Sequence, residues 1–240
     1  MKRCKFFYLC TTFLAIALTA VFLVLMFEPE TSRAAGLWYV APGGNNTNDC
    51  KSPGNPCATI NGALAKPAFV SGDTVLVAAG VYTGTGDEVV KIKNIDVILS
   101  GGWAPGFSVQ NGYSTIDGEG ERRGIDIDSE YGYPTNINFE RIEVRDCDDS
   151  GIRNHGILTM TDSIVQSNYG LLGGGINNSN MLSLKNSTVS GNSSKYSGGG
   201  IHNSGTLELM NSTVKDNQTE GDGGGIETSV FELYTSYLTL

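Results

Sequence analysis

The segments GGGINNSNMLSLKNSTVSGN (173–192) and GGGIHNSGTLELMNSTVKDN (198–217) are two copies of one sequence unit. A third GGGI begins at Gly223, so the unit recurs every 25 residues. Within each copy apolar and polar residues alternate, which is typical of strands with one buried face. The runs are short and end in Asn, Ser or Gly, the usual turn residues. A repeat of this length with three short strands predicts one coil of a parallel β-helix.

Stacking the units predicts which side chains face the interior. Upstream copies begin at Ile152 and Ile125, each of which follows a glycine. The expected inward columns are Ile137, Leu158, Leu182 and Leu207; Phe139, Met160, Leu184 and Leu209; and Val144, Val165, Val189 and Val214. Two asparagine columns are Asn154, Asn178 and Asn203, and Asn168, Asn192 and Asn217. Because an amide both donates and accepts hydrogen bonds, we expect these asparagines to form structural ladders between coils.

The unit GGGI-x-N-x-G-x-L-x-L-x-N-S-x-V-x-x-N resembles the repeat of the polymorphic outer membrane proteins, whose motifs are GGA[IVL] and FxxN. Here Gly replaces Ala in the first motif, and Val replaces Phe in the second, as in Val189–Asn192. The resemblance covers residues 124–240. More broadly, the chain is similar to exported proteins with a right-handed β-helix of the pectate-lyase-like superfamily. That resemblance implies an all-β fold and leaves activity open, since the fold hosts lyases, hydrolases, adhesins and inert surface proteins.

Residues 1–34 predict an export signal. Lys2, Arg3 and Lys5 precede an apolar run over 6–27, and a stretch of small residues surrounds Ala34 and Ala35. A basic start, an apolar centre and an A-x-A-like site are typical of a secretory signal peptide. The apolar run is also long enough to span a bilayer, so an uncleaved N-terminal anchor is the alternative. We therefore expect a secreted protein, or one at the cell surface or outer envelope.

The charge of the remaining chain limits its partners. Residues 1–34 carry four basic and two acidic side chains, so their removal changes the formal net charge from −9 to −11. This acidity argues against nucleic acid and anionic membrane surfaces as partners. We expect contact with a membrane only through an uncleaved N-terminal segment. The expected partners are carbohydrate or another component of the cell surface.

Residues 35–84 are predicted to form an N-terminal cap and the first coil. The cap contains a short strand over 38–40 and a helix over 57–65, an order that resembles the cap of pectate-lyase-like proteins. Cys50 and Cys57 bracket a turn-rich loop and are expected to form a disulfide, since no further metal ligand stands nearby. Cys147 takes a place in an asparagine column and is expected to be a small buried side chain.

Residues 85–240 are assigned to the β-helix itself. Two segments, 101–112 and 130–134, interrupt its pattern and are expected to loop out from the wall. The last coil begins at Ile226 and no capping segment follows it, so we expect the chain to be a fragment of a longer reading frame.

The acidic run Asp146–Asp149, followed by Arg153 and His155, is the cluster most suggestive of chemistry. In polygalacturonase-like β-helices, an aspartate pair acts with an aspartate of the next coil and a Gly-His-Gly one coil later. Here Asn154-His155-Gly156 follows Asp148 by only seven residues, so that pattern is not met. Stacking does place Asp128 beside His155. His202 stands alone and is expected to face solvent.

We therefore predict a non-enzymatic scaffold that is structural, adhesive or carbohydrate-contacting, with no catalytic residue, metal or cofactor. The alternative is a polysaccharide lyase or glycoside hydrolase that acts on acidic polysaccharide, and its candidate residues are Asp128, Asp148, Asp149 and His155. Only that alternative would call for Ca²⁺, held by carboxylates on one face. A second alternative is a fragment of an autotransporter-like passenger.

Overall fold

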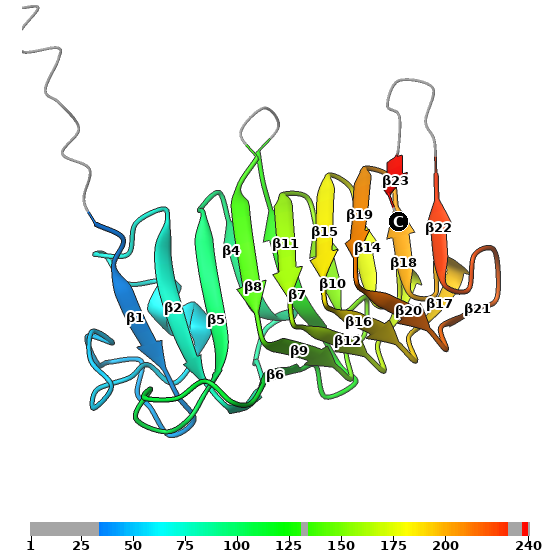
Figure 1. The fold of residues 1–240 in the computed structure, drawn as a ribbon. Helices are drawn as coiled ribbons and strands as arrows, with labels where there is room; N and C mark the ends of the chain where they lie inside the picture. The colour runs from blue at the N-terminus through cyan, green and yellow to red at the C-terminus, as the bar shows by residue number, and fades with distance from the viewer. Residues whose placement is uncertain (1–33, 131–133, 230–236, 240) are drawn as a thin grey trace, which may run out of the picture. The chain divides into compact units, whose positions relative to one another are not determined.

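The computed structural model describes residues 34–130, 134–229 and 237–239, and residues 35–240 form one compact unit. This unit is a parallel β-helix, in which the chain winds repeatedly through the same set of sheets (Figure 1). The fold predicted from the 25-residue repeat is therefore confirmed. The expected export signal lies outside the described residues. No helix in the part of the chain that is described is long and apolar enough to cross a membrane.

The strands of this unit form four sheets, and every strand pairs in parallel with its neighbours. Sheet 1 consists of β1 (Leu37–Val40), β2 (Asp73–Ala78), β5 (Val97–Trp103), β8 (Asn136–Glu140), β11 (Ile157–Thr161), β15 (Met181–Lys185), β19 (Thr206–Met210) and β23 (Tyr237–Thr239). Sheet 2 consists of β4 (Glu88–Lys93), β7 (Arg123–Asp128), β10 (Ile152–Asn154), β14 (Ile176–Asn178), β18 (Ile201–Asn203) and β22 (Ile226–Thr228).

The other two sheets complete each coil. Sheet 3 consists of β3 (Gly80–Tyr82), β6 (Ser114–Asp117), β9 (Ile142–Arg145), β12 (Ile164–Gln166), β16 (Thr188–Ser190) and β20 (Thr213–Lys215). Sheet 4 consists of β13 (Tyr169–Leu172), β17 (Ser193–Ser197) and β21 (Gln218–Thr219). Among the strands that the structure describes, sheets 2 and 3 each have one from each of six coils, whereas sheet 4 has strands from three of the later coils.

The register stacks equivalent residues of successive coils, as the sequence predicts. In sheet 1, Leu158 pairs with Ile137 on one side and with Leu182 on the other. In sheet 3, Val165 lies between Val144 and Val189 in the same way. These side chains are buried, and together they form one continuous apolar core along the solenoid. Burial of this core is the main favourable term in the stability of the fold.

The glycine triplets make the sharp corner before β14, β18 and β22 of sheet 2. The first glycine of each triplet is left-handed, with φ of +62° at Gly173, a conformation that costs glycine nothing. The second has no room for a side chain, because a Cβ on Gly174 would lie 2.0 Å from the carbonyl oxygen of Ser193. The triplets therefore let one coil approach the next closely at this corner.

The two asparagine columns form hydrogen-bonded ladders inside the solenoid. In the first, Asn154 Nδ2 donates to Asn178 Oδ1 and Asn178 Nδ2 donates to Asn203 Oδ1, both at 2.7 Å. In the second, Asn168 Nδ2 donates to Asn192 Oδ1 at 2.9 Å, and Asn192 Nδ2 donates to Asn217 Oδ1 at 3.0 Å. These amides also bond to main-chain groups at the corners, so their polar groups are satisfied although the side chains are buried.

Cys147 stands where the second ladder begins. Its main-chain N–H donates to Asn168 Oδ1 at 3.1 Å, and its side chain is buried. Burial raises the pKa of the Cys147 thiol to about 12. A buried thiol that stays protonated is chemically inert, so this cysteine is a packing residue.

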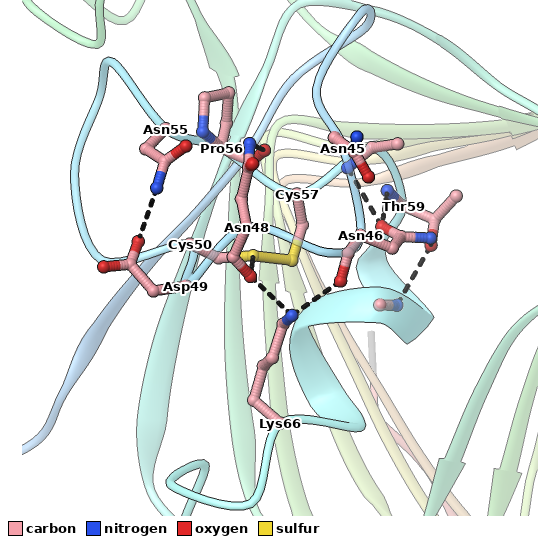
Figure 2. The surroundings of a disulfide bond; sticks show 12 residues. Asn45, Asn46, Asn48, Asp49, Cys50, Asn55, Pro56, Cys57, Thr59 and Lys66 are labelled. Atoms are coloured by element: carbon pink, nitrogen blue, oxygen red, sulfur yellow. Dashed lines mark hydrogen bonds between the residues drawn. A yellow bond between two sulfur atoms is a disulfide. The ribbon is translucent and has the colours of Figure 1, made fainter.

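A short helix and a disulfide lie near the first coil of the solenoid (Figure 2). The helix α2 (Ile60–Leu64) is capped by Thr59, whose hydroxyl accepts a hydrogen bond from Gly62 N at 3.0 Å. It is shorter than the predicted span of 57–65, because the chain before Thr59 is held extended by Asn46. The structure joins Cys50 to Cys57. Lys66 Nζ donates to the carbonyl oxygens of Asn46 and Asn48, just before the disulfide, at 2.6 and 2.5 Å.

Two loops were predicted to protrude from the wall. The first is shorter than expected, because β5 continues through Gly101 to Trp103 and pairs there with Ala78. The looped segment is therefore 104–112 rather than 101–112. The second loop, 130–134, has its central residues 131–133 outside the described part of the chain.

Removal of the disulfide is expected to lower the free energy of unfolding by about 2 to 3 kcal/mol, since the crosslink closes a short loop in the unfolded chain. The measurement is urea unfolding of Cys50→Ser/Cys57→Ser and of the parent chain. Reduction of the parent should give the same loss, and reduction of the double variant should change nothing. An unchanged midpoint in the double variant would contradict this expectation.

Candidate functional site

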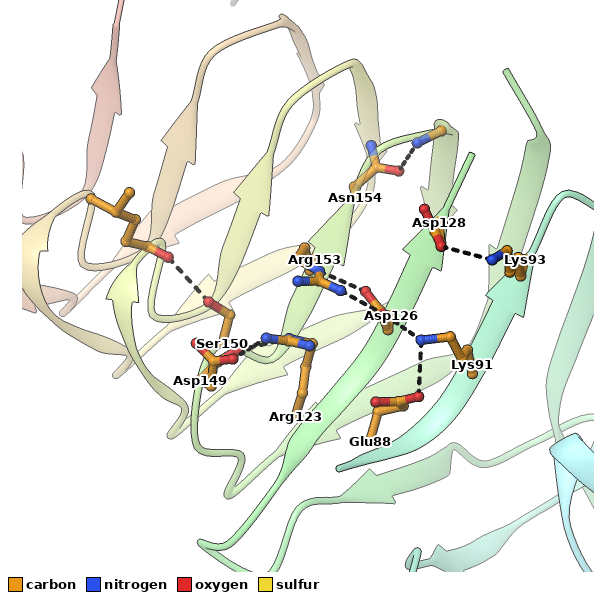
Figure 3. Close-up of polar contacts among 12 residues, drawn as sticks. Glu88, Lys91, Lys93, Arg123, Asp126, Asp128, Asp149, Ser150, Arg153 and Asn154 are labelled. Carbon is orange, nitrogen blue, oxygen red and sulfur yellow. Dashed lines mark hydrogen bonds and ion pairs between the residues drawn. The ribbon is translucent and has the colours of Figure 1, made fainter. Parts of the chain in front are cut away.

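Charged side chains gather on the outward face of sheet 2 (Figure 3). Lys91 of β4 pairs in register with Asp126 of β7, which pairs in turn with Arg153 of β10. Because residues in register on neighbouring parallel strands stand side by side, the three side chains form a row across successive coils. We call Lys91, Asp126 and Arg153 the charged row.

Asp126 is the centre of the charged row. Arg153 donates two hydrogen bonds to its carboxylate, from Nε to Oδ1 at 2.7 Å and from Nη2 to Oδ2 at 2.8 Å. Lys91 Nζ lies 3.0 Å from Asp126 Oδ2 and 3.2 Å from Glu88 Oε1. The Asp126 side chain is 0% exposed, whereas those of Arg153 and Lys91 are 37% and 43% exposed. The two cations therefore cover the carboxylate and separate it from solvent.

These contacts determine the ionisation of Asp126. Burial by itself would raise the pKa of its carboxyl, but hydrogen bonds from Arg153 and Lys91 outweigh that effect and leave the pKa lowered. The hydrogen bond to Asp126 is likewise the main cause that raises the pKa of Arg153. Asp126 is therefore an ionised, fully engaged carboxylate that has no proton to donate at neutral pH.

Asp126→Asn is expected to lower the free energy of unfolding at pH 7 by about 2 kcal/mol, the typical value of hydrogen bonds to a charged group. Because the folded pKa is lowered, the carboxylate stabilises the fold above about pH 4, the unfolded value, and this contribution disappears as pH falls through the folded pKa. The difference between parent and variant should therefore shrink on acidification. Urea unfolding at a series of pH values measures it.

The matched control is Asp128→Asn on the same strand. Asp128 is partly exposed and its ion pair with Lys93 is long, at 3.7 Å, so we expect a change below about 0.5 kcal/mol. An equal loss in both variants, or a loss in Asp126→Asn that does not depend on pH, would contradict the role given to Asp126.

The four candidate residues of the enzymatic alternative are not brought together. Asp128 is the last residue of β7, two residues after Asp126. His155 is exposed and comes directly after β10. The two are neighbours in register, yet the partner of the Asp128 carboxylate is Lys93. Asp149 lies at the opposite end of β10 and pairs with Arg123. Asp148 is exposed, and its Oδ1 accepts the main-chain N–H of Asp149 at 3.0 Å.

The row continues along sheet 2 with Asn177, His202 and Glu227. The prediction that His202 faces solvent is wrong, since this side chain is buried with only 8% of the residue exposed. Its Nδ1 lies 2.7 Å from Glu227 Oε2 and 3.2 Å from Ser197 Oγ. A carboxylate from the next coil and a hydroxyl from the preceding corner cover the ring, which sequence position alone does not reveal.

Within the described ranges, no group of three or more His, Cys, Asp or Glu side chains is arranged to hold a metal ion. Asp126 and Asp128 lie on one strand, but their oxygens are taken by Arg153, Lys91 and Lys93. Both oxygens of Asp126, the ligand type that Ca²⁺ prefers, bond to Arg153 and Lys91.

The charged row was missed in the sequence, although its signal is present. The repeat aligns Ile125 with Ile152 as the starts of two upstream copies, and the next residue in each strand is Asp126 or Arg153. Extending the same register to outward positions would have paired them. Lys91 is harder to find, because the irregular chain between β4 and β7 gives no fixed spacing between the two coils.

The fold and this face define a parallel β-helix protein with a polar outer wall. No family model matches the sequence, and no curated protein matches it. Among solved structures, the chain is similar to a rhamnogalacturonan lyase, with a TM-score of 0.39 and 12% sequence identity. The matched region covers 82% of this chain and 62% of that chain, so this chain spans less than two thirds of the lyase. A likeness this distant says nothing of what the protein binds or does.

Proposed function

We propose that the chain is a non-catalytic β-helix scaffold that is exported or held at the cell surface and contacts carbohydrate. The observation that carries this proposal is the pairing of charges over sheet 2. Asp126 is enclosed by Arg153 and Lys91, Asp128 pairs with Lys93, and Asp149 pairs with Arg123. Each of these three aspartates thus forms an ion pair with a basic residue of a neighbouring coil.

Glycan cleavage needs a different arrangement. An acid or base must reach the proton that it transfers, with a pKa matched to the working pH. Asp126 has a lowered pKa and no exposed surface, while Arg153 and Lys91 direct their donors at it. Cross-strand pairs of this kind stabilise a sheet and specify its register. We therefore infer a structural role for the charged row.

The surface location rests on three features. The basic and apolar N-terminal segment is typical of an export signal. A disulfide such as Cys50–Cys57 persists in oxidising compartments outside the cytosol. The acidity of residues 35–240 suits a soluble exposed wall and disfavours nucleic acid and anionic lipid. Of the partner classes considered, carbohydrate is the one that these features leave in place.

Native gel electrophoresis in gels that contain polysaccharide tests this proposal. The full chain is kept in solution with a detergent that has no sugar headgroup, and is run in gels that contain hydroxyethyl cellulose, dextran or polygalacturonate. We expect at least one polymer to retard it. The same chain, reduced and denatured before electrophoresis in urea, is the control and should migrate alike in every gel. Equal mobility of the native chain in all gels would contradict the proposal.

A polysaccharide lyase or hydrolase is the second candidate. It is favoured by one observation: a carboxylate and two cations of the types used as acid, base and charge stabiliser meet on one outward face. In this case Arg153→Lys would abolish cleavage of an acidic polymer, because lysine cannot form both hydrogen bonds to the Asp126 carboxylate. The scaffold proposal expects no cleavage in either chain.

A further inference from the structure

Sheet 4 carries an exposed apolar surface on its outer side. Tyr169 and Leu171 of β13 are 43% and 49% exposed, and Tyr196 of β17 is 55% exposed. Leu172 is also exposed, so four of the twelve large exposed apolar residues in the described chain lie on two adjacent short strands. Gathered apolar surface of this kind is typical of a site of interaction, whereas single exposed residues are not.

The backbone explains why these side chains share one face. Tyr169 pairs with Ser193 and Gly170 pairs with Ser194, and the second pair faces the interior. Alternation then places Tyr169, Leu171 and Lys195 outside. A register shift after Gly170 brings Tyr196 to the outer face as well. We call Tyr169, Leu171, Lys195 and Tyr196 the tyrosine platform.

The two aromatic rings are offset along the sheet. Tyr196 lies one strand over from Tyr169 and three residues beyond its register partner Ser193. Because the register shift pairs Ser197 with Leu172, Tyr196 stands about two residues along the sheet from Tyr169. At about 3.3 Å per residue and about 4.8 Å between strands, their backbones are roughly 8 Å apart. This separation exceeds one sugar ring, so the two tyrosines can contact different units of one polymer chain.

Polar groups stand between and beside the rings. The Lys195 ammonium lies 5.1 Å from the centroid of the Tyr196 ring and forms no ion pair within the described residues. On the next strand, Gln218 is beside Ser193 and Glu220 follows in the position beside Lys195. The platform therefore offers apolar faces together with hydrogen-bond donors and acceptors of both charges, close to neutrality overall.

This mixture determines the kind of partner. A pyranose ring has an apolar face and a rim of hydroxyls, so it matches an exposed tyrosine flanked by donors and acceptors. A buried protein interface would favour a more continuous apolar centre. An anionic membrane is disfavoured by the acidity of residues 35–240. Because Glu220 offsets Lys195, a neutral sugar polymer fits better than an acidic one.

We propose that the tyrosine platform binds a neutral pyranose polysaccharide, with Tyr169 and Tyr196 stacking on separate sugar units and with Lys195 and Glu220 bonding to sugar hydroxyls. This inference rests on the proposed carbohydrate contact and assigns it to a place and a class of glycan. It also separates the binding surface, in sheet 4 of the later coils, from the charged row of sheet 2.

The test is affinity electrophoresis of the full chain in hydroxyethyl cellulose and in polygalacturonate, over a range of polymer concentrations. The platform predicts stronger retardation by the neutral polymer. Tyr169→Ala and Tyr196→Ala should each weaken binding about tenfold, the usual size of an aromatic contact. Tyr→Phe at the same positions keeps the stacking ring and should stay within about threefold of the parent.

Tyr113→Ala is the matched control, since Tyr113 is 39% exposed and lies outside sheet 4. It should bind like the parent, and all variants should keep the parental melting temperature because the replaced rings are exposed. Retention of the parent together with unchanged affinity in both platform variants would overturn the platform and leave the proposed function intact. Retention by no polymer would overturn both. Retention only by polygalacturonate, or platform-dependent binding only to lipid vesicles, would overturn the assignment to a neutral glycan.

Discussion

Gly174→Ala is expected to lower the free energy of unfolding by about 3 kcal/mol or more. A Cβ at this position would lie 2.0 Å from Ser193 O and 2.7 Å from Gly199 O, both main-chain atoms. Backbone of two coils must move to relieve such a clash, and strain of this kind belongs to the upper range of single-residue effects. Urea unfolding followed by far-ultraviolet circular dichroism measures the loss.

Gly54→Ala is the control for this substitution. No atom lies within 4 Å of a Cβ built on Gly54, and its φ is not left-handed. We expect a change within about 0.5 kcal/mol, as for other surface substitutions. If Gly174→Ala unfolded at the same urea concentration as Gly54→Ala, the close approach of coils at the glycine corner would be refuted.

Asn178→Ala is expected to cost about 2 to 4 kcal/mol. Asn178 is buried in the middle of its ladder, where Nδ2 donates to Asn203 and Oδ1 accepts from Asn154. Alanine would remove both bonds and leave each neighbouring amide with one fewer partner in a place that water does not reach. Unsatisfied buried groups cost more than the mean value of a hydrogen bond.

The adjacent Asn177→Ala provides the comparison. Asn177 is the same residue type on the same strand, but its side chain belongs to the outward row and is only partly buried. We expect it to cost less than about 1 kcal/mol. Thermal unfolding of the two variants side by side distinguishes them. Similar losses of stability in both would show that the ladder adds nothing beyond the packing of the β-helix wall.

The stacking of the inward-facing side chains was predictable from the sequence. A fixed period with alternating polarity determines both the coil and the register, so the leucine and valine columns could be stacked correctly. The asparagine ladders followed from the same spacing. The Cys50–Cys57 disulfide followed from a short loop in a segment expected to be exported. Each of these features depends on local pattern or on translation by one coil.

The contacts of outward-facing side chains were less predictable, because they depend on which side chains meet between coils of unequal length. The partners of Asp126 come from 35 residues before it and 27 residues after it. The burial of His202 depends on Glu227 from the next coil. Such contacts have no repeating signature, and a register has to be known before they can be recognised.

The two outer faces differ in a way that bears on function. Side chains of the charged row satisfy one another, and this gives sheet 2 a polar wall with few free groups. The tyrosine platform leaves aromatic and polar groups without comparable coverage. A solenoid can keep such faces apart because each sheet stacks strands of successive coils at a fixed place.

The measurement that tests the central claim most directly is the product analysis of polygalacturonate incubated with the folded full chain, with and without Ca²⁺. Viscosity and the ultraviolet absorbance of unsaturated uronate report cleavage by hydrolysis or elimination. A non-catalytic scaffold leaves the length of the polymer unchanged in both conditions. Progressive shortening that is lost in Asp148→Ala/Asp149→Ala or in Arg153→Lys would contradict the account and identify the outward face of sheet 2 as an active site.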